Sequence, residues 1–165
     1  MKNVYFSPAK LNLSLLVNPP RSDGYHNIFS IFQKISLTDN LTFTYQASSN
    51  PSFTLTASGI ACPVDSSNCL FKLFNDIKDQ LTVSISCHIE KHIPLGSGMG
   101  GSSSNVATFI HFLKENKLLN LTEQEWLKIA LNIGADVPFF LNGTTALVEG
   151  IGDKVTVLKN DKKYF

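Results

Sequence analysis

Cysteine is scarce in this 165-residue sequence, and its cysteines lack the spacing that is typical of a metal or disulfide site. Cys62, Cys69 and Cys87 are odd in number and form no C-x-x-C motif. The sequence therefore predicts neither a disulfide framework nor a zinc knuckle, and it is compatible with the reducing cytoplasm. No metal ligands are predicted either, because His88 and His92 lie in a predicted strand and its end, where residues four apart lack the shared helical face of a metal pair.

Long apolar runs and an excess of one charge are absent as well. No apolar run reaches the roughly 18 residues of a membrane-spanning helix, and the N-terminus does not have the pattern of a signal peptide, so we expect a cytoplasmic protein. The net charge is +1 and the basic residues form no stripe, so neither nucleic acid nor a membrane is expected as a partner. With 43% hydrophobic residues, the chain is expected to form one globular domain.

The most informative stretch is Pro94 to Asn105, which contains four glycines and four serines and no charged residue. Residues 81–90 before it alternate apolar and polar side chains, as in a half-buried strand, and residues 106–113 after it have apolar side chains at helical spacing. Glycines allow backbone N–H groups to approach an anion closely, and the positive end of a helix favours negative charge. The order of strand, loop and helix therefore predicts a phosphate-binding loop.

Three other interpretations of this stretch are less consistent with the sequence. Gly- and Ser-rich composition is also typical of a flexible linker, but linkers rarely lie inside one strand-loop-helix unit. The loop matches the dinucleotide pattern as Gly96-x-Gly98-x-x-Gly101, yet the acidic residue about 20 positions on, Glu123, lies at a predicted helix start instead of a strand end. A Walker A motif is excluded because no Gly-Lys-Ser/Thr occurs.

Two N-terminal segments carry further candidate residues. Residues 4–18 alternate as a strand that places Lys10, Asn12 and Ser14 on one face, where Lys10 is either a solvated edge lysine or a functional group. The turn at Asp23-Gly24 exposes Tyr25 and His26, which could stack on a base and bond its edge, or belong to a plain hairpin.

The remaining pattern predicts ordinary structural elements and one more candidate. Residues 28–57 give three strand-like runs, and a capped helix is expected from about residue 68 to 77. Thr122-x-x-Glu125 is a capping box that opens a helix ending at Gly134. Asp136 follows among apolar residues, where it is either a general base or a helix cap.

Four separated motifs resemble, in order, the kinase superfamily named for galactokinase, homoserine kinase, mevalonate kinase and phosphomevalonate kinase (the GHMP kinases). They are Ser7-Pro8-Ala9-Lys10-Leu11-Asn12-Leu13, Arg21-x-Asp23-Gly24-Tyr25-His26, the loop from Pro94 to Ser104, and Gly134-Ala135-Asp136-x-Pro138. The resemblance implies an α+β fold, in which a mixed β-sheet is backed by helices and contains a left-handed β-α-β unit, as in ribosomal protein S5 domain 2. It implies that residues 1–165 are the N-terminal ATP-binding domain and that the family's C-terminal domain is absent.

The resemblance also implies an activity and a role for each candidate residue. The reaction is the ATP- and Mg²⁺-dependent phosphorylation of a small-molecule alcohol, with Asp136 as base and Lys10 beside it as the second catalytic residue. The first two motifs together resemble the branch of the family that phosphorylates the 2-hydroxyl of a diphosphocytidyl methylerythritol in isoprenoid (terpenoid) precursor synthesis. This implies substrate contacts from Asn12, Tyr25 and His26. Another small-molecule kinase of the superfamily, or a non-catalytic nucleotide-binding fragment, is the alternative. The residues expected to bind ATP are Pro94, Leu95, Gly96, Ser97, Gly98, Met99, Gly100, Gly101, Ser102, Ser103 and Ser104.

Overall fold

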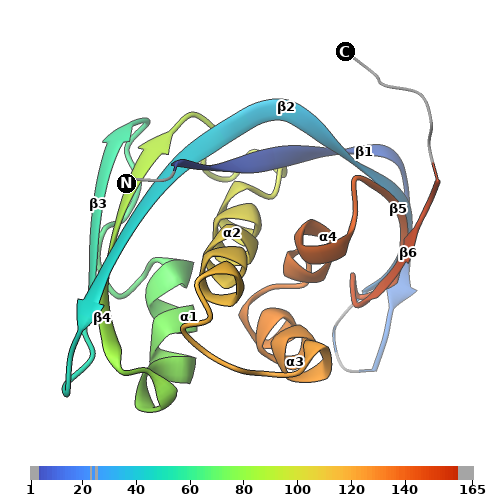
Figure 1. Ribbon diagram of the computed structural model, residues 1–165. Coiled ribbons are helices and arrows are strands. Elements are labelled where there is room, and N and C mark those ends of the chain that lie inside the picture. Colours follow the sequence, from blue (N-terminus) through green and yellow to red (C-terminus); the bar gives the residue numbers. More distant parts are fainter. Residues whose placement is uncertain (1–3, 23, 25, 160–165) are drawn as a thin grey trace.

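The computed structural model describes residues 4–22, 24 and 26–159, and it shows one curved sheet over a layer of helices (Figure 1). The predicted fold class, a mixed sheet backed by helices, is confirmed. Within the described residues, no helix is both long and apolar enough to cross a membrane. The elements in chain order are β1 (Val4–Pro20), β2 (His26–Ala47), β3 (Phe53–Gly59), α1 (Cys69–Ile77), the 3₁₀ helix η1 (Lys78–Gln80), β4 (Val83–Lys91), α2 (Gly101–Glu115), α3 (Glu123–Ile133), α4 (Val137–Asn142), β5 (Thr145–Gly150) and β6 (Lys154–Val157).

The sheet is organised around β2, a strand of 22 residues. The strand order is β3-β4-β2-β5-β6, and β1 pairs with β2 in an antiparallel hairpin. Along its other edge β2 pairs first with β5, through residues 28–33, and then with β4, through residues 40–47. Residues 34–39 of β2 therefore lie where the sheet divides, with β5 and β6 on one side and β4 and β3 on the other (Figure 1).

The prediction of three strand-like runs between residues 28 and 57 is wrong in one respect. The first two runs are one continuous strand, β2, and only Phe53–Gly59 is separate. The apolar alternation is interrupted between them, but pairing with β1 keeps this part of the backbone extended. The other predicted strands and helices are all present.

One parallel strand pair, β3 with β4, is connected through α1. This is the β-α-β unit that the family resemblance implies, and the hand of its crossover stays a prediction. Asn68 caps α1, since its side chain accepts a hydrogen bond from Leu70 N. The predicted capping box of α3 is present, with both the Thr122 and Glu125 side-chain bonds formed.

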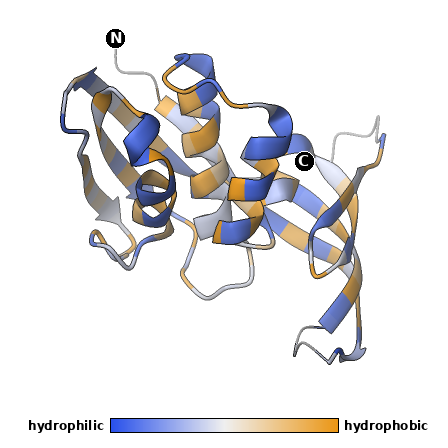
Figure 2. Ribbon diagram, turned by 90° about the horizontal axis from the view of Figure 1, so that it is seen from below, coloured by the Kyte–Doolittle hydropathy of each residue, from blue (hydrophilic) through white to orange (hydrophobic). Residues whose placement is uncertain are grey.

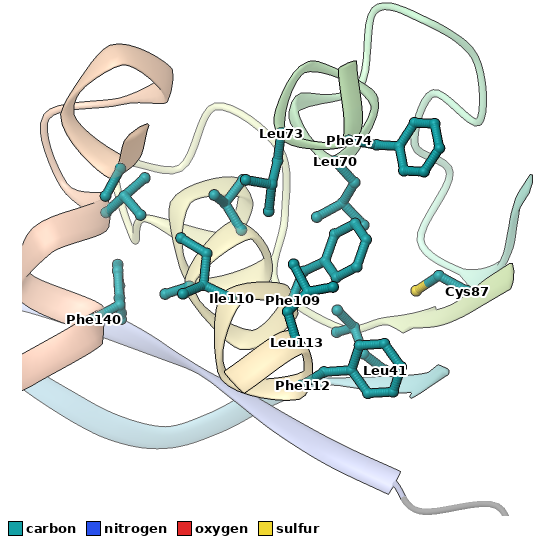
Figure 3. Packing of buried hydrophobic residues seen from close by; sticks show 14 of the residues in the cluster. Leu41, Leu70, Leu73, Phe74, Cys87, Phe109, Ile110, Phe112, Leu113 and Phe140 are labelled. Atoms are coloured by element: carbon teal, nitrogen blue, oxygen red, sulfur yellow. The ribbon is translucent and has the colours of Figure 1, made fainter. Parts of the chain in front are cut away.

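The core lies between the sheet and α2, which has α1 on one side and α4 on the other (Figure 3). Phe43 of β2 stacks on Phe109 and Phe112 of α2, with ring centroids 5.1 and 4.4 Å apart. Hydrophobic and hydrophilic residues alternate along the strands, as a sheet with one covered face requires (Figure 2). The packing fixes α2 against the sheet and thereby fixes its N-terminus, where the predicted phosphate loop ends.

Candidate active site

The predicted phosphate loop connects the end of β4 to the start of α2 and lines a pocket of about 210 Å³. Nine of the eleven residues predicted to bind ATP line this pocket, all except Met99 and Ser104, and Lys91 and Asp136 complete its wall. In the described part of the chain, Asp136 contributes the one carboxylate that lines it. The sequence interpretation therefore agrees with the geometry: the loop, the helix start and Asp136 meet at one place.

The loop backbone has a conformation that residues other than glycine rarely adopt. Gly98 and Gly100 both have positive φ values, of 72° and 70°. The 15-residue helix α2 begins immediately after Gly100 and buries most of its length against the core. The first N–H groups of a helix have no partner within the helix and carry its partial positive charge. This end of the pocket is therefore suited to an anion.

Met99 and Ser104 hold the loop in place instead of lining the pocket. The carbonyl oxygen of Met99 accepts a hydrogen bond from Lys10 N at 2.9 Å, which ties the loop to β1. The Ser104 hydroxyl is buried and lies 2.8 Å from the Ser7 hydroxyl. Both residues therefore support the loop from the side of the sheet.

Lys10 is buried, so the interpretation as a solvated edge lysine is wrong. Only 5% of the residue is exposed, and its ammonium lies 4.2 Å from the centroid of the Phe32 ring. It donates a hydrogen bond to Asn12 Oδ1 at 2.7 Å and forms an ion pair with Asp136 Oδ2 at 3.5 Å. Asn12 in turn donates to Ser30 Oγ at 3.0 Å, so the carboxamide that orients Lys10 is itself oriented.

Asp136 precedes α4, but its side chain does not cap that helix. Its carboxylate is directed to Lys10 and the pocket, and 29% of the side chain is exposed. The alternative of a helix-capping aspartate is therefore wrong. A carboxylate that is accessible to ligand, with an ammonium beside it and an anion site opposite, can accept a proton from an alcohol next to a bound phosphate.

Of the two hairpin residues predicted to contact the substrate, His26 does not line this pocket. Tyr25 lies outside the described residues. His26 starts β2 opposite Pro20, at the part of the sheet beside β5, and its Nδ1 lies 2.8 Å from Asn18 O. The predicted hairpin is present, and whether it binds a base stays a prediction.

Sequence reasoning missed three buried polar residues near the loop: Ser7, Asp39 and Lys91. The burial of Lys91 could have been predicted, because this residue continues the alternation of Ile85, Cys87 and Ile89 along β4. Its ammonium pairs with the Asp39 carboxylate. For Ser7 and Asp39 the sequence has no comparable signal, since their partners come from distant segments.

Comparison with known proteins agrees with this architecture. Residues 68–144 match the N-terminal domain of GHMP kinases. The chain is 40% identical over 166 residues to 4-diphosphocytidyl-2-C-methyl-D-erythritol kinase of Alkaliphilus oremlandii, covering 99% of this chain and 56% of that protein. It is also 40% identical over 163 residues to the enzyme of the same name from Carboxydothermus hydrogenoformans, covering 97% of this chain and 55% of that protein. The chain thus spans about half the length of the curated relatives it matches.

Solved structures show the same fold. A crystal structure of 4-(cytidine 5′-diphospho)-2C-methyl-D-erythritol kinase superposes with a TM-score of 0.78 at 30% identity, covering 94% of this chain and 55% of that one. A mevalonate kinase structure superposes with a TM-score of 0.63 at 14% identity, covering 96% of this chain and 57% of that one, which shows the shared fold alone. These matches and the arrangement of loop, helix and strands show that the chain has the fold of the GHMP kinase N-terminal domain.

Proposed function

We propose that residues 1–165 form the ATP-binding N-terminal domain of a kinase that transfers the γ-phosphoryl group of ATP to the 2-hydroxyl of 4-diphosphocytidyl-2-C-methyl-D-erythritol. The observation that carries the proposal is the Lys10–Asp136 ion pair, which opens onto a glycine-rich pocket at the N-terminus of α2. The names of the curated relatives and of a similar crystal structure support the choice of substrate. The reaction would serve isoprenoid precursor synthesis.

In this proposal each residue has a defined task. Backbone N–H groups of the loop and of the first turn of α2 bind the triphosphate, where the helix dipole favours its charge. Asp136 accepts the proton of the substrate hydroxyl, and Lys10 favours the ionised form of that carboxylate and polarises the attacking oxygen. Asn12 keeps the Lys10 ammonium directed at the site.

The pocket also fits Mg²⁺ through the chemistry of its donors. Mg²⁺ prefers oxygen ligands and is commonly bound by one or two carboxylates together with substrate phosphates. Asp136 and the hydroxyls of Ser102 and Ser103 are the oxygen donors that could hold it here. When bound, the ion neutralises charge on the phosphates during transfer.

Recognition of the cytidine group is assigned to Tyr25 and His26. An aromatic ring can stack on cytosine, and an imidazole can bond its polar edge. We also propose a cytoplasmic location, which the free thiols of Cys62, Cys69 and Cys87 support.

The first test is Asp136→Asn, which keeps the size of the side chain and removes the base. Turnover should fall by roughly 10²- to 10⁴-fold, while the affinity for ATP stays similar. A kinase assay with ATP and the cytidine substrate, together with calorimetric titration of ATP, measures both quantities. Asp76→Asn, an equivalent change on the exposed side of α1, is the matched control and should alter neither.

Two results would contradict the proposal. Unchanged turnover in Asp136→Asn would remove this residue from the mechanism. A full-length enzyme that binds ATP and forms no product would be a nucleotide-binding protein instead of a kinase.

A further inference from the structure

The phosphate loop is anchored at both of its ends by residues that lie opposite each other on β1 and β2. Ser7 of β1 is paired with Asp39 of β2 in the sheet register, and both are fully buried. We propose that Ser7 and Asp39 are positioning residues, which together hold the loop in its anion-binding shape before any ligand arrives. The inference rests on the proposed function, because that function gives the loop its task of binding phosphate. The anchoring itself can be tested without an activity assay.

Asp39 holds the chain just before the loop. Its Oδ1 accepts hydrogen bonds from the backbone N–H groups of His92 and Ile93, both at 2.8 Å. Its Oδ2 accepts from the Lys91 ammonium. One carboxylate therefore fixes three consecutive residues, and Pro94, the first residue of the loop, follows them directly.

Ser7 holds the chain just after the loop. Its hydroxyl donates to Asn105 Oδ1 at 2.8 Å and lies 2.8 Å from the Ser104 hydroxyl. Since a hydroxyl has one proton, Ser104 is the donor in that second pair. Ser104 and Asn105 are in the first turns of α2 and are themselves buried, so Ser7 fixes the helix start to β1.

The same anchoring places the Lys91 ammonium, which is paired with Asp39, in the wall of the pocket. Lys91 lines the pocket, and its ammonium lies only 3.1 Å from where a Cβ on Gly101 would be. The bond from Lys10 N to Met99 O holds the middle of the loop. Donors that are fixed before binding lose less entropy on binding and need less reorganisation.

A purely structural role predicts a different result from a positioning role. Removing any buried hydrogen bond lowers stability, wherever it lies. Removing an anchor of the loop should in addition mobilise residues 94–103 and weaken anion binding. A control that loses an equivalent bond elsewhere separates the two roles.

The first experiment compares Ser7→Ala with Thr145→Val. Thr145 is a buried residue of β5 whose hydroxyl donates to Gln33 Oε1 at 2.6 Å, and neither residue lines the pocket. Hydrogen–deuterium exchange of the ligand-free 165-residue chain should show at least about tenfold faster exchange for residues 94–103 in Ser7→Ala and wild-type exchange there in Thr145→Val. Equal loop exchange in Ser7→Ala and wild type would overturn the proposal for Ser7.

The second experiment examines Asp39 without leaving a buried lysine unpaired. Asp39→Asn with Lys91→Met keeps an oxygen acceptor for the two backbone N–H groups, whereas Asp39→Ala with Lys91→Met removes it. Only the double variant with alanine at position 39 (the alanine pair), and not the one with asparagine there (the asparagine pair), should show faster hydrogen exchange in the loop, again by about tenfold or more. If both pairs behave alike, Asp39 does not position the loop.

Tripolyphosphate is the probe for anion binding, because it has the phosphates of ATP without the nucleoside. Its dissociation constant should rise at least about fivefold in Ser7→Ala relative to wild type, and by a similar factor in the alanine pair relative to the asparagine pair, which lacks the same lysine. It should stay at the wild-type value in Thr145→Val. An unaltered constant in a variant with a mobilised loop would overturn the link to binding. If the wild-type chain binds no tripolyphosphate, the proposed function fails, while the exchange experiments still decide whether the two residues anchor the loop.

Discussion

Gly100 lies where the predicted phosphate loop packs against Phe140 of α4 and Lys10 of β1. A Cβ at this position would lie 2.8 and 2.9 Å from two atoms of the Phe140 ring and 3.2 Å from Lys10 Cγ. Its φ of 70° is a further obstacle to any other residue. Gly98 has a similar φ, of 72°, but open space around the Cβ position.

This contrast predicts the outcome of two alanine substitutions. Gly98→Ala should cost about 1 to 2 kcal/mol of unfolding free energy, from backbone strain alone. Gly100→Ala should cost at least about 1 kcal/mol more, because Phe140 and Lys10 must also move. Urea unfolding of both variants gives the comparison, and equal losses would mean that the ring of Phe140 yields without cost.

The surroundings of Lys10 were predicted from the sequence only in part. Alternation along residues 4–18 places Lys10 and Asn12 on one face, and the hydrogen bond between them agrees with it. Burial of Lys10 could not be predicted, because Phe32 and Asp136, which surround it, come from distant segments. Only the family resemblance connected Lys10 to Asp136 in advance.

At the scale of elements, a side-chain hydrogen bond joins α4 to β2. This helix has only six residues, and Asp136 immediately precedes it. Lys34, which lies opposite Lys10 in the β1–β2 register, donates to Phe140 O at 3.0 Å. Burial lowers the pKa of Lys34 from 10.5 to about 8.

The lowered pKa has a definite consequence for stability. Between pH 8 and 10.5 the unfolded chain binds a proton at Lys34 that the folded chain has released. The contribution of this lysine to the unfolding free energy therefore increases as pH rises through that window. Urea unfolding at pH 7 and 9.5 should show wild type gaining about 2 kcal/mol relative to Lys34→Met. The same difference at both pH values would contradict the assignment.

Elements with local signals were predicted well, and those that depend on distant partners were not. The capping box at Thr122 and the alternation of β4 are contained in a few neighbouring residues. The continuity of β2 depends on β1, because pairing extends the part that has no apolar alternation. The anchoring of the loop by Asp39 likewise spans more than 50 residues of sequence.

At the scale of the whole molecule, the hairpin and the pocket lie in different parts of the sheet. His26 is near the pairing of β2 with β5, whereas the loop leaves the end of β4. Contacts to the two proposed substrates should therefore be separable. Tyr25→Ala with His26→Ala should raise the KM for the cytidine substrate at least about tenfold, through lost stacking and hydrogen bonding, and leave the KM for ATP nearly unchanged.

Steady-state kinetics with each substrate varied in turn measures both constants. His88→Ala is a suitable control, because His88 bonds Thr56 and Ser58 on the strands at the other side of the sheet. Equal increases in both constants in the hairpin variant would show that the turn supports the fold and does not select the substrate.

The length of β2 also limits how this protein can change in evolution. Successive residues of a strand face opposite sides, so the loss of one residue between Phe32 and Asp39 would turn Asp39 away from the loop or shift the pairing with β4 and β5. A substitution at one position affects mainly its own contacts, whereas a deletion here would disturb both halves of the sheet together. Insertions and deletions among relatives should therefore gather in the connections around residues 48–52 and 60–67 and be rare within β2.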